Sequence, residues 1–338
     1  MIDAIKTASL RIVRMQLFWP VAGLGLLLLF NLVQSPTFFH LEIRDGHLYG
    51  SLIDVLNQGS ICVLLALGMT LVIATGGIDL SVGSIMAMSG AVAALLVTQS
   101  HLPFGLIVVI ALAMGLIAGL WNGVLVAFAG IQPFVATLIL MIAGRGVAQL
   151  LTDGQIITFR NDSFIFLGNG HFLGLPFTVT IMVIAFIAVS LLTRKTALGM
   201  FIESVGNNET ASRFAGINVR MIKILVYGVC GVCAGMAGLI STSYIKAADV
   251  SRMGEMSELD AIFAVVVGGT ALTGGRFNLL GSIIGALLLQ TLILTMYDQG
   301  VSPHIMPVPK ALVIISVCLL LSEELRAKVN RIFKRMKG

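Results

Sequence analysis

Ten apolar segments recur along this chain of 338 residues, and most of them are long enough to cross a bilayer as a helix, which takes about 20 residues. Backbone polar groups must be satisfied within each segment at that depth, so helices are expected. The sequence therefore predicts an all-α polytopic membrane protein with ten transmembrane helices. They are expected at residues 17–33, 52–75, 80–99, 103–128, 133–151, 176–193, 223–244, 259–273, 279–297 and 307–322.

The composition supports a surface that faces lipid. Hydrophobic residues make up 57% of the chain and charged residues only 11%, whereas a soluble domain carries about 25% charged residues. The net charge of +5 would suggest a nucleic-acid partner in a soluble protein. Here the basic residues stand at the ends of apolar segments, where they set topology, so membrane lipid is the expected contact and nucleic acid is not.

The basic residues also predict the orientation of the chain. Most of the 21 lysines and arginines fall near the N-terminus, in the 194–223 connection or in the C-terminal tail, which all lie on one side of a ten-helix arrangement. By the positive-inside rule this side is cytoplasmic, and both termini lie there. We expect one transmembrane domain, 1–322, followed by a basic cytoplasmic tail, 323–338.

Two segments have unusual ends. The first apolar segment, 17–33, is not followed by a small-x-small cleavage motif and is long for a signal-peptide core, so a retained helix is predicted. The eighth segment, 259–273, is short and has glycine-rich stretches beside it. A broken or tilted element is therefore expected there.

The inner connection, 194–222, is the longest loop of the predicted topology, although helix–helix connections usually need about 2–8 residues. Asn207 or Asn208 can cap a short helix within it, and Gly216 is suited to end that helix. A solvated connector would not need such a helix. We therefore interpret the segment as a docking element for another protein.

The side chains of this short helix fit that interpretation. Glu209 would stand in its first turn, where a negative charge is favourable. Ala211 and Phe214 follow on the same helix and are available to fill a groove on a partner, in the manner of helix-in-groove recognition.

Polar residues within or beside the apolar segments are candidates for contact with a polar solute, because such residues usually face a cavity or a partner. Arg145 lies between two glycines of the fifth segment, and Asp79 lies in a Gly-rich stretch where it could cap the next helix, mark a backbone break near a transport path, or both. Asp54 and Glu258 lie at further segment edges. The candidates for the translocation path are Asn57, Gln58, Asp79, Asn122, Gln132, Arg145 and Asp260.

Motifs of catalysis are missing. No glycine is followed by lysine, so the phosphate-binding G-x-x-x-x-G-K-[ST] loop is absent, and neither H-E-x-x-H nor G-x-S-x-G occurs. The five histidines stand singly in predicted outer loops. We expect no catalytic residue, no metal site and no cofactor in this chain.

Three stretches carry a resemblance to a known family: TGGIDLSVGS at 75–84, the 206–217 segment, and ELDAIFAVVVGGTALTGG at 258–275. They resemble the monosaccharide permeases of bacterial ABC importers, the family of the ribose, arabinose, xylose and galactose permeases, over roughly residues 57–322. Further stretches are nearest to its galactofuranose permeases: GLWNGVLV at 119–126, IQPFVATLILMIAG at 131–144, LLTRKTALGMF at 191–201 and GRFNL at 275–279.

The resemblance implies a multi-pass subunit of the bacterial cytoplasmic (inner) membrane that admits a monosaccharide by alternating access. Its implied partners are a second permease subunit, homologous or identical, an ATP-binding ABC subunit that uses the ATP, and a periplasmic sugar-binding protein. The resemblance also makes 194–222 a coupling segment. The positions that the family motif and the helix pattern assign to coupling are Gly206, Asn207, Asn208, Glu209, Ala211, Arg213, Phe214, Gly216 and Ile217.

Two other transport classes are weighed against this one. An ion-coupled secondary transporter tends to place carboxylates at the membrane midplane, whereas the acids here stand at predicted helix edges. A channel has no use for a long docking loop. An ATP-driven importer is favoured over both.

Overall fold

The computed structural model describes residues 17–44 and 46–321, and almost all of its regular structure is helical. The basic tail expected at 323–338 lies outside these residues. The helices are α2 (Phe18–Gln34), η1 (Pro36–Phe39), α3 (Ser51–Ala74), α4 (Val82–Gln99), α5 (Phe104–Ala127), α6 (Pro133–Leu151), α7 (Asp162–Asn169), α8 (Phe177–Arg194), α9 (Leu198–Asn207), α10 (Glu209–Phe214), α11 (Val219–Ile245), α12 (Ser257–Val267), α13 (Leu279–Asp298) and α14 (Pro307–Leu321).

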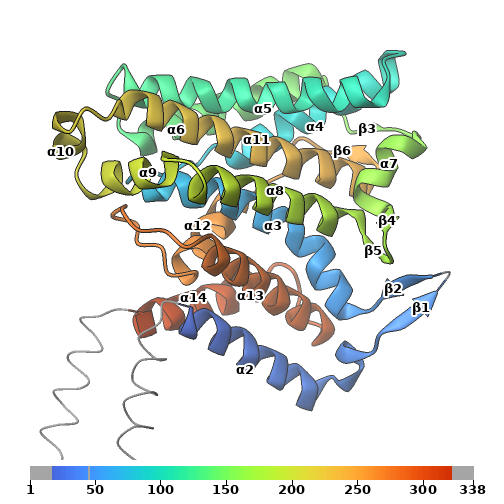
Figure 1. The fold of residues 1–338 in the computed structure, drawn as a ribbon. Coiled ribbons are helices and arrows are strands. Elements are labelled where there is room, and N and C mark those ends of the chain that lie inside the picture. Colours follow the sequence, from blue (N-terminus) through green and yellow to red (C-terminus); the bar gives the residue numbers. More distant parts are fainter. Residues whose placement is uncertain (1–16, 45, 322–338) are drawn as a thin grey trace, which may run out of the picture.

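Short antiparallel strand pairs complete the regular structure. The strands are β1 (Glu42–Arg44), β2 (His47–Tyr49), β3 (Ile157–Thr158), β4 (His171–Phe172), β5 (Leu175–Pro176) and β6 (Ala247–Ala248). β1 pairs with β2, β3 with β6, and β4 with β5. They lie with α7 at one end of the helical bundle, which we call the α7 end, while α9 and α10 lie at the opposite end, the α10 end (Figure 1).

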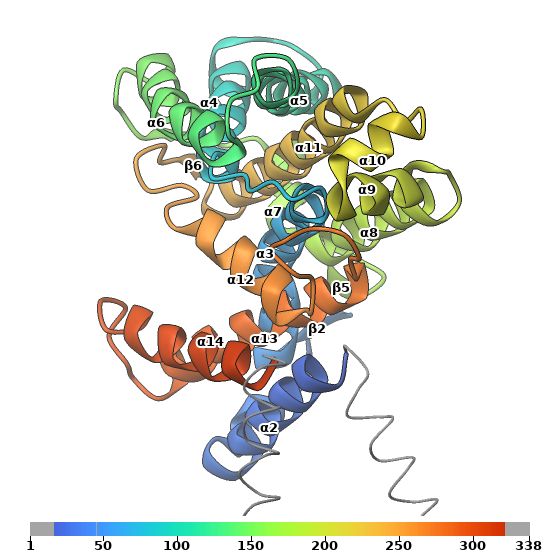
Figure 2. The same ribbon diagram turned by 90° about the vertical axis from the view of Figure 1, so that its left-hand side faces the viewer.

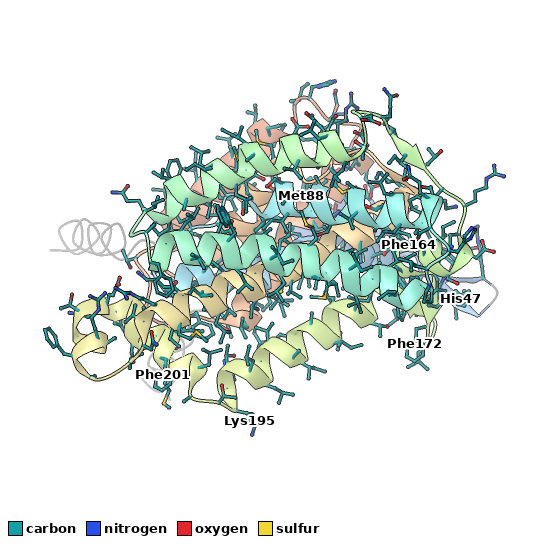
Figure 3. The ribbon with its side chains drawn as sticks, turned by 90° about the horizontal axis from the view of Figure 1, so that it is seen from above. His47, Met88, Phe164, Phe172, Lys195 and Phe201 are labelled. Atoms are coloured by element: carbon teal, nitrogen blue, oxygen red, sulfur yellow. The ribbon has the colours of Figure 1, made fainter. Side chains whose placement is uncertain are left out.

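Side chains mark the same two ends. His47 and Phe172 lie toward one end of the bundle and Phe201 and Lys195 toward the other (Figure 3). Seen from the side, α2 and α14 lie along one flank, α5 and α6 along the opposite flank, and α3 in between (Figure 2).

Within residues 17–44 and 46–321, seven helices are long and apolar enough to span a membrane: α3, α4, α5, α6, α8, α11 and α13. The expectation of a helical polytopic membrane protein is confirmed at this level. Each of the ten predicted segments also contains a helix, but α2, α12 and α14 are shorter than the seven.

The eighth segment shows where the sequence-based boundary was wrong. Its helix, α12, ends at Val267, six residues before the predicted end at 273. Gly268 and Gly269 follow, and Gly269 adopts a left-handed backbone with φ +91° that stops the helix. A non-helical connection then leads to α13, as the expected break implied.

The inner connection is also more structured than predicted. It contains two helices, α9 and α10, where one short helix was expected. α9 forms because apolar residues recur at helical spacing, with Leu198, Ile202 and Val205 buried on one face.

The bundle has a buried centre and exposed flanks. α3, α4, α11 and α13 are mostly buried, whereas at most a third of α5, α6 and α8 is buried although they are as apolar. Close contact between α5 and the central helix α11 depends on glycine: a Cβ at Gly119 would lie 2.3 Å from the Tyr227 carbonyl oxygen, and one at Gly115 2.5 Å from that of Gly231. Small residues allow such approach where lipid gives no hydrophobic driving force.

Candidate functional site

The short helix α10 has a side-chain cap at its N-terminus. Asn208 has an extended backbone, φ −160°, and its Oδ1 accepts a hydrogen bond from the Ala211 amide at 2.9 Å. This geometry satisfies one of the amides left free at a helix N-terminus. Of the two asparagines proposed as the cap, Asn208 takes the role.

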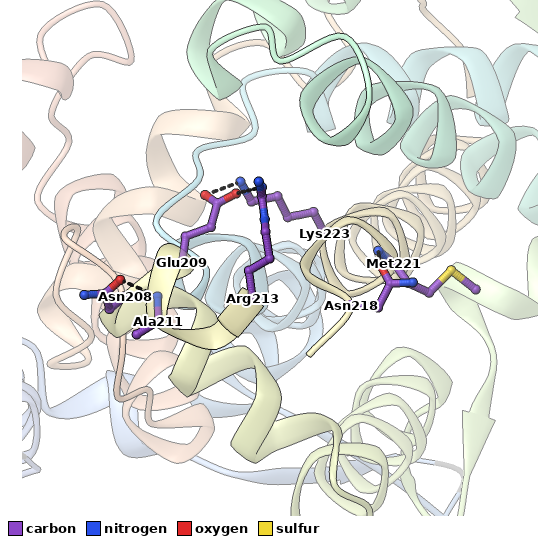
Figure 4. A network of polar contacts seen from close by, with 7 residues as sticks. All are labelled: Asn208, Glu209, Ala211, Arg213, Asn218, Met221 and Lys223. Atoms are coloured by element: carbon purple, nitrogen blue, oxygen red, sulfur yellow. Dashed lines mark hydrogen bonds and ion pairs between the residues drawn. The ribbon is translucent and has the colours of Figure 1, made fainter. Parts of the chain in front are cut away.

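Charged side chains fix α10 against α11. Glu209 accepts from Lys223 Nζ at 2.7 Å and lies 3.5 Å from the Arg213 guanidinium (Figure 4). The Arg213 pair is exposed and contributes little, but the Lys223 side chain is only 16% exposed, so its ion pair is less screened. Glu209 thus connects α10 to the first turns of α11.

A turn of defined geometry follows α10. Gly216 adopts φ +84°, a left-handed conformation that glycine tolerates best, and Ile217 donates its amide to the Ser212 carbonyl at 3.0 Å. Asn218 then caps α11 by accepting from the Met221 amide at 3.2 Å. The predicted stop at Gly216 therefore coincides with the observed turn.

Phe214 projects from the end of this helix. Its side chain is 89% exposed, although it belongs to the most apolar class of residue. Aromatic residues at such positions are frequent anchors of protein–protein interfaces. α10 therefore presents one large apolar group on a rigid, capped and charge-fixed support.

Gly206 does not face outward with Phe214, and Asn207, although exposed, borders the same contact. A Cβ at Gly206 would lie 1.9 Å from the Ala74 carbonyl oxygen and 2.4 Å from the Gly275 nitrogen. The Gly275 amide donates to the same Ala74 oxygen at 2.9 Å, and a Cβ at Gly275 would lie 2.6 Å from Asn207 Oδ1. The start of the coupling segment is thus seated on the end of α3 and on the 268–278 connection. We call this contact the glycine junction.

Two path candidates, Asp79 and Asn122, lie in a buried hydrogen-bond network. Asp79 Oδ1 accepts from the Ser81 amide at 2.8 Å and from its hydroxyl at 2.6 Å, and Asn122 Nδ2 donates to the same hydroxyl oxygen at 2.8 Å. Both side chains are fully buried. This network holds the break between α3 and α4 against α5, which favours the structural interpretation of Asp79.

Arg145 and Gln132 are placed apart from the other candidates. The Arg145 guanidinium donates to the carbonyl oxygens of Val250 and Met253, so it ties α6 to the loop before α12. Gln132 is exposed at the N-terminus of α6.

The remaining path candidates meet at one cavity. Asn57, Gln58 and Asp260 line a space of about 270 Å³ between α3, α11, α12 and α13. Gln290, Tyr244 and Ser257 line it as well and were not among the sequence candidates. A signal for Gln290 did exist, because it is a lone amide inside the ninth apolar segment.

A second cavity, of about 240 Å³, adjoins the α7 end and shares Asn57 with the first. Asp54, Tyr49 and His171 are among its lining residues. The rings of His171 and His47 stack with their centroids 4.3 Å apart. Burial first, and then the His47 ring, lower the pKa of the His171 imidazole. The His171 imidazole, which lines the second cavity, is therefore uncharged at neutral pH.

Comparison with known proteins decides the family. Residues 51–322 match the family described as "Branched-chain amino acid transport system / permease component". The chain belongs to this permease family. The family resemblance read from the sequence is confirmed, and with seven helices able to span a bilayer the chain is a multi-pass permease of the cytoplasmic membrane.

Named relatives of the permease include sugar transporters. The chain is 49% identical to the galactofuranose transporter permease protein YtfT of Escherichia coli (strain K12), over 94% of this chain and 95% of the relative. It is 42% identical to the fructose import permease protein FruF of Bifidobacterium longum, over 90% and 87%. It is 41% identical to the ribose import permease protein RbsC of Escherichia coli (strain K12), over 88% and 91%. No solved structure matches the chain.

Proposed function

We propose that this chain is the membrane-spanning permease subunit of an ATP-driven importer of a monosaccharide, with galactofuranose the best match. The observation that carries the proposal is the 49% identity with a permease named for galactofuranose, over nearly the full length of both chains. The fructose and ribose permeases among the relatives support the wider class of sugar.

The proposed assembly contains two permease subunits, homologous or identical, an ATP-binding subunit that hydrolyses the ATP, and a periplasmic sugar-binding protein. The ATP-binding subunit would dock at the α10 end on Phe214, and the sugar-binding protein at the α7 end. In this topology α2, α12 and α14 complete ten membrane elements, and both termini are cytoplasmic. The chain itself would hold no cofactor and perform no catalysis.

Transport would proceed by alternating access. Closure of the ATP-binding subunits would move α10, and the glycine junction would pass that movement to α3 and to the connection between α12 and α13. α3 lines the polar cavity near its other end, through Asn57 and Gln58. The support for this route is the direct backbone contact of Gly206 and Gly275 with Ala74.

The alternative is an ion-coupled secondary transporter of a small polar solute. Such a transporter needs carboxylates free to bind the coupling ion. Asp79 accepts two hydrogen bonds from Ser81 in a buried network, and Asp260 is paired with Lys310. One oxygen of each carboxylate is thus engaged within the protein, which supports the ATP-driven class.

Uptake in cells tests the proposal. Cells that lack their own sugar importers would express this chain together with a candidate ATP-binding subunit and a candidate sugar-binding protein. Uptake of labelled galactofuranose should require all subunits, persist when the proton gradient is collapsed, and stop when ATP is depleted. Accumulation by the isolated chain in vesicles, driven by a proton or sodium gradient, would reject the ATP-driven class. Uptake of ribose or fructose but not galactofuranose would correct the substrate.

A further inference from the structure

The cavity between α3, α11, α12 and α13 has the size and the lining of a small-solute site. Its volume of about 270 Å³ stands near the lower limit of ligand pockets, roughly 300 Å³. Polar groups are expensive inside a membrane bundle, so several that converge on one space require an explanation. Packing alone does not provide one, because apolar residues would fill the space at lower cost.

The side-chain amides that line the cavity have only part of their hydrogen-bonding capacity satisfied. Gln290 Nε2 donates to Gln58 Oε1 at 3.2 Å, and Asn57 Oδ1 accepts from the Thr178 hydroxyl at 2.6 Å. Within the described residues, Asn57 Nδ2, Gln58 Nε2 and Gln290 Oε1 have no hydrogen-bond partner. The lining thus offers donors and an acceptor side by side, and a hydroxyl group needs both because it donates one hydrogen bond and accepts others.

The charge of the cavity is balanced before any solute enters. Asp260 is the only Asp, Glu, Lys, Arg or His among the described lining residues, and the Lys310 ammonium of α14 contacts its Oδ1. The side chains are 26% and 18% exposed, so neither charge is screened as at a surface. Asp260 Oδ2 is left to accept further hydrogen bonds. The pair is neutral as a unit.

This balance distinguishes two classes of solute. A zwitterionic amino acid brings a carboxylate and an ammonium that each need an unpaired opposite charge once they leave water. The cavity has no unpaired charge to give. A neutral sugar needs only hydroxyl partners and an apolar wall for its C–H groups, and Ile61, Leu65 and the Tyr244 ring provide such a wall.

We propose that this cavity binds the hydroxyl groups of an uncharged monosaccharide and excludes amino acids, with Lys310 setting the selectivity by neutralising Asp260. The inference rests on the proposed sugar import and deepens it, because it assigns the contacts and the charge rule that select the solute. Lys310 acts through Asp260 and is a positioning residue.

Protection of an introduced cysteine tests the site directly. The full chain carrying Ser257→Cys, with its four native cysteines replaced by alanine because Cys62 lines the same cavity, would be placed in lipid nanodiscs and labelled with a small neutral maleimide. D-galactose or D-ribose should slow labelling by about twofold or more when the site is half occupied or better, and L-leucine should not. Ser251→Cys, exposed in the loop before α12, is the matched control and should label equally with every solute.

Charge variants test the selectivity rule. In the Lys310→Met form the Asp260 carboxylate has no counter-charge. Galactosamine, which is cationic, should therefore slow the labelling of Ser257→Cys more than galactose does. In the Asp260→Asn form the Lys310 ammonium has no counter-charge. Galacturonate, which is anionic, should then slow the labelling more than galactose does. The Asp260→Asn/Lys310→Met double variant is neutral and should again prefer galactose. A purely structural ion pair would lower folding in the single variants without these opposite preferences.

The outcomes separate this inference from the proposed function. Protection by leucine but not by either sugar would overturn the selectivity. If no solute protects Ser257→Cys while the assembled importer still takes up sugar with ATP, the cavity is not the sugar site, although sugar import stands. If the importer takes up no sugar at all, it is the proposed function that fails.

Discussion

The coupling segment and the polar cavity are opposite in construction. The proposed coupling segment is local, since the Asn208 cap, the Glu209 ion pairs and the Gly216 turn lie within sixteen positions of one another, and it leaves Phe214 exposed. The cavity joins helices far apart in sequence, and its hydrogen bond between Gln58 and Gln290 spans 232 positions. The difference fits the two proposed roles: the coupling segment would bind a protein, and the cavity would enclose a small solute.

The two regions are connected at the glycine junction, so the largest effect is expected there. Gly206→Ala places a methyl group 1.9 Å from the Ala74 oxygen, and such overpacking of backbone costs about 1–3 kcal/mol or forces the segment off α3. Uptake should fall by about tenfold or more, equivalent to 1.4 kcal/mol in a coupled equilibrium. Labelled-sugar uptake measures it. Gly146→Ala, with open space around its Cβ, is the matched control and should transport normally.

Breaking the cavity's charge balance should have the next largest effect. Lys310→Met leaves the partly buried Asp260 carboxylate unpaired, which should destabilise the protein by up to about 3 kcal/mol. Thermal unfolding in detergent measures the loss as a lower Tm. The Asp260→Asn/Lys310→Met double variant should recover most of it, and an equally low Tm in both forms would contradict the charge explanation.

The turn after α10 should tolerate one substitution and not another. Gly216→Val puts a β-branched residue at φ +84°, at a cost of about 1–2 kcal/mol, and should distort the presentation of α10. The assembled importer should then still hydrolyse ATP when sugar is added, while its sugar uptake falls. Gly216→Asn is the control, because asparagine adopts this conformation more readily. Equal coupling in both variants would remove the turn from the mechanism.

Truncating the exposed aromatic should weaken docking without affecting the fold. Phe214→Ala removes a side chain that is 89% exposed, so its Tm should change little, whereas co-purification of the ATP-binding subunit should decrease. Phe172→Ala, half exposed at the α7 end, should leave that co-purification unchanged. The opposite pattern would place the ATP-binding subunit at the other end of the bundle.

The smallest effect is expected at the helix cap. Asn208→Ala removes the bond to the Ala211 amide, which costs about 1 kcal/mol of local stability. Faster hydrogen exchange should appear in α10 and not in the cavity helices. Asn208→Asp keeps an acceptor and should exchange as the wild type does.

The same contrast explains what could be predicted from the sequence. Membrane helices can be predicted from the length of an apolar segment. The Asn208 cap and the helix end at Gly216 can also be predicted, because each depends on residues that are adjacent in the sequence. Contacts between distant helices leave no such signal: nothing around Lys310 in the sequence indicates Asp260, and nothing around Arg145 indicates the carbonyls of Val250 and Met253.

Two errors have equally local causes. α12 was predicted too long because Ala271 and Leu272 continue the apolar pattern, although the glycines before them already end the helix. α7 lies between the predicted segments 133–151 and 176–193, where no helix was predicted, because eight residues with a glycine give a weak periodic signal. It is fixed from outside, by Ser243 of α11, whose hydroxyl donates to the Phe164 carbonyl and accepts from the Gly168 amide, each at 2.7 Å.

The uninterrupted length of α3 has a mechanical consequence. Its 24 residues contain no proline and form one continuous helix, and about 25 Å of helix separates Gln58 from Ala74 at 1.5 Å per residue. A rod of that length acts as a lever: a tilt of about 5° imposed at one tip swings the other by about 2 Å. That swing exceeds the tolerance of a hydrogen bond, so a slight displacement of the Ala74 tip would suffice to part Gln58 from Gln290 and open the proposed solute cavity.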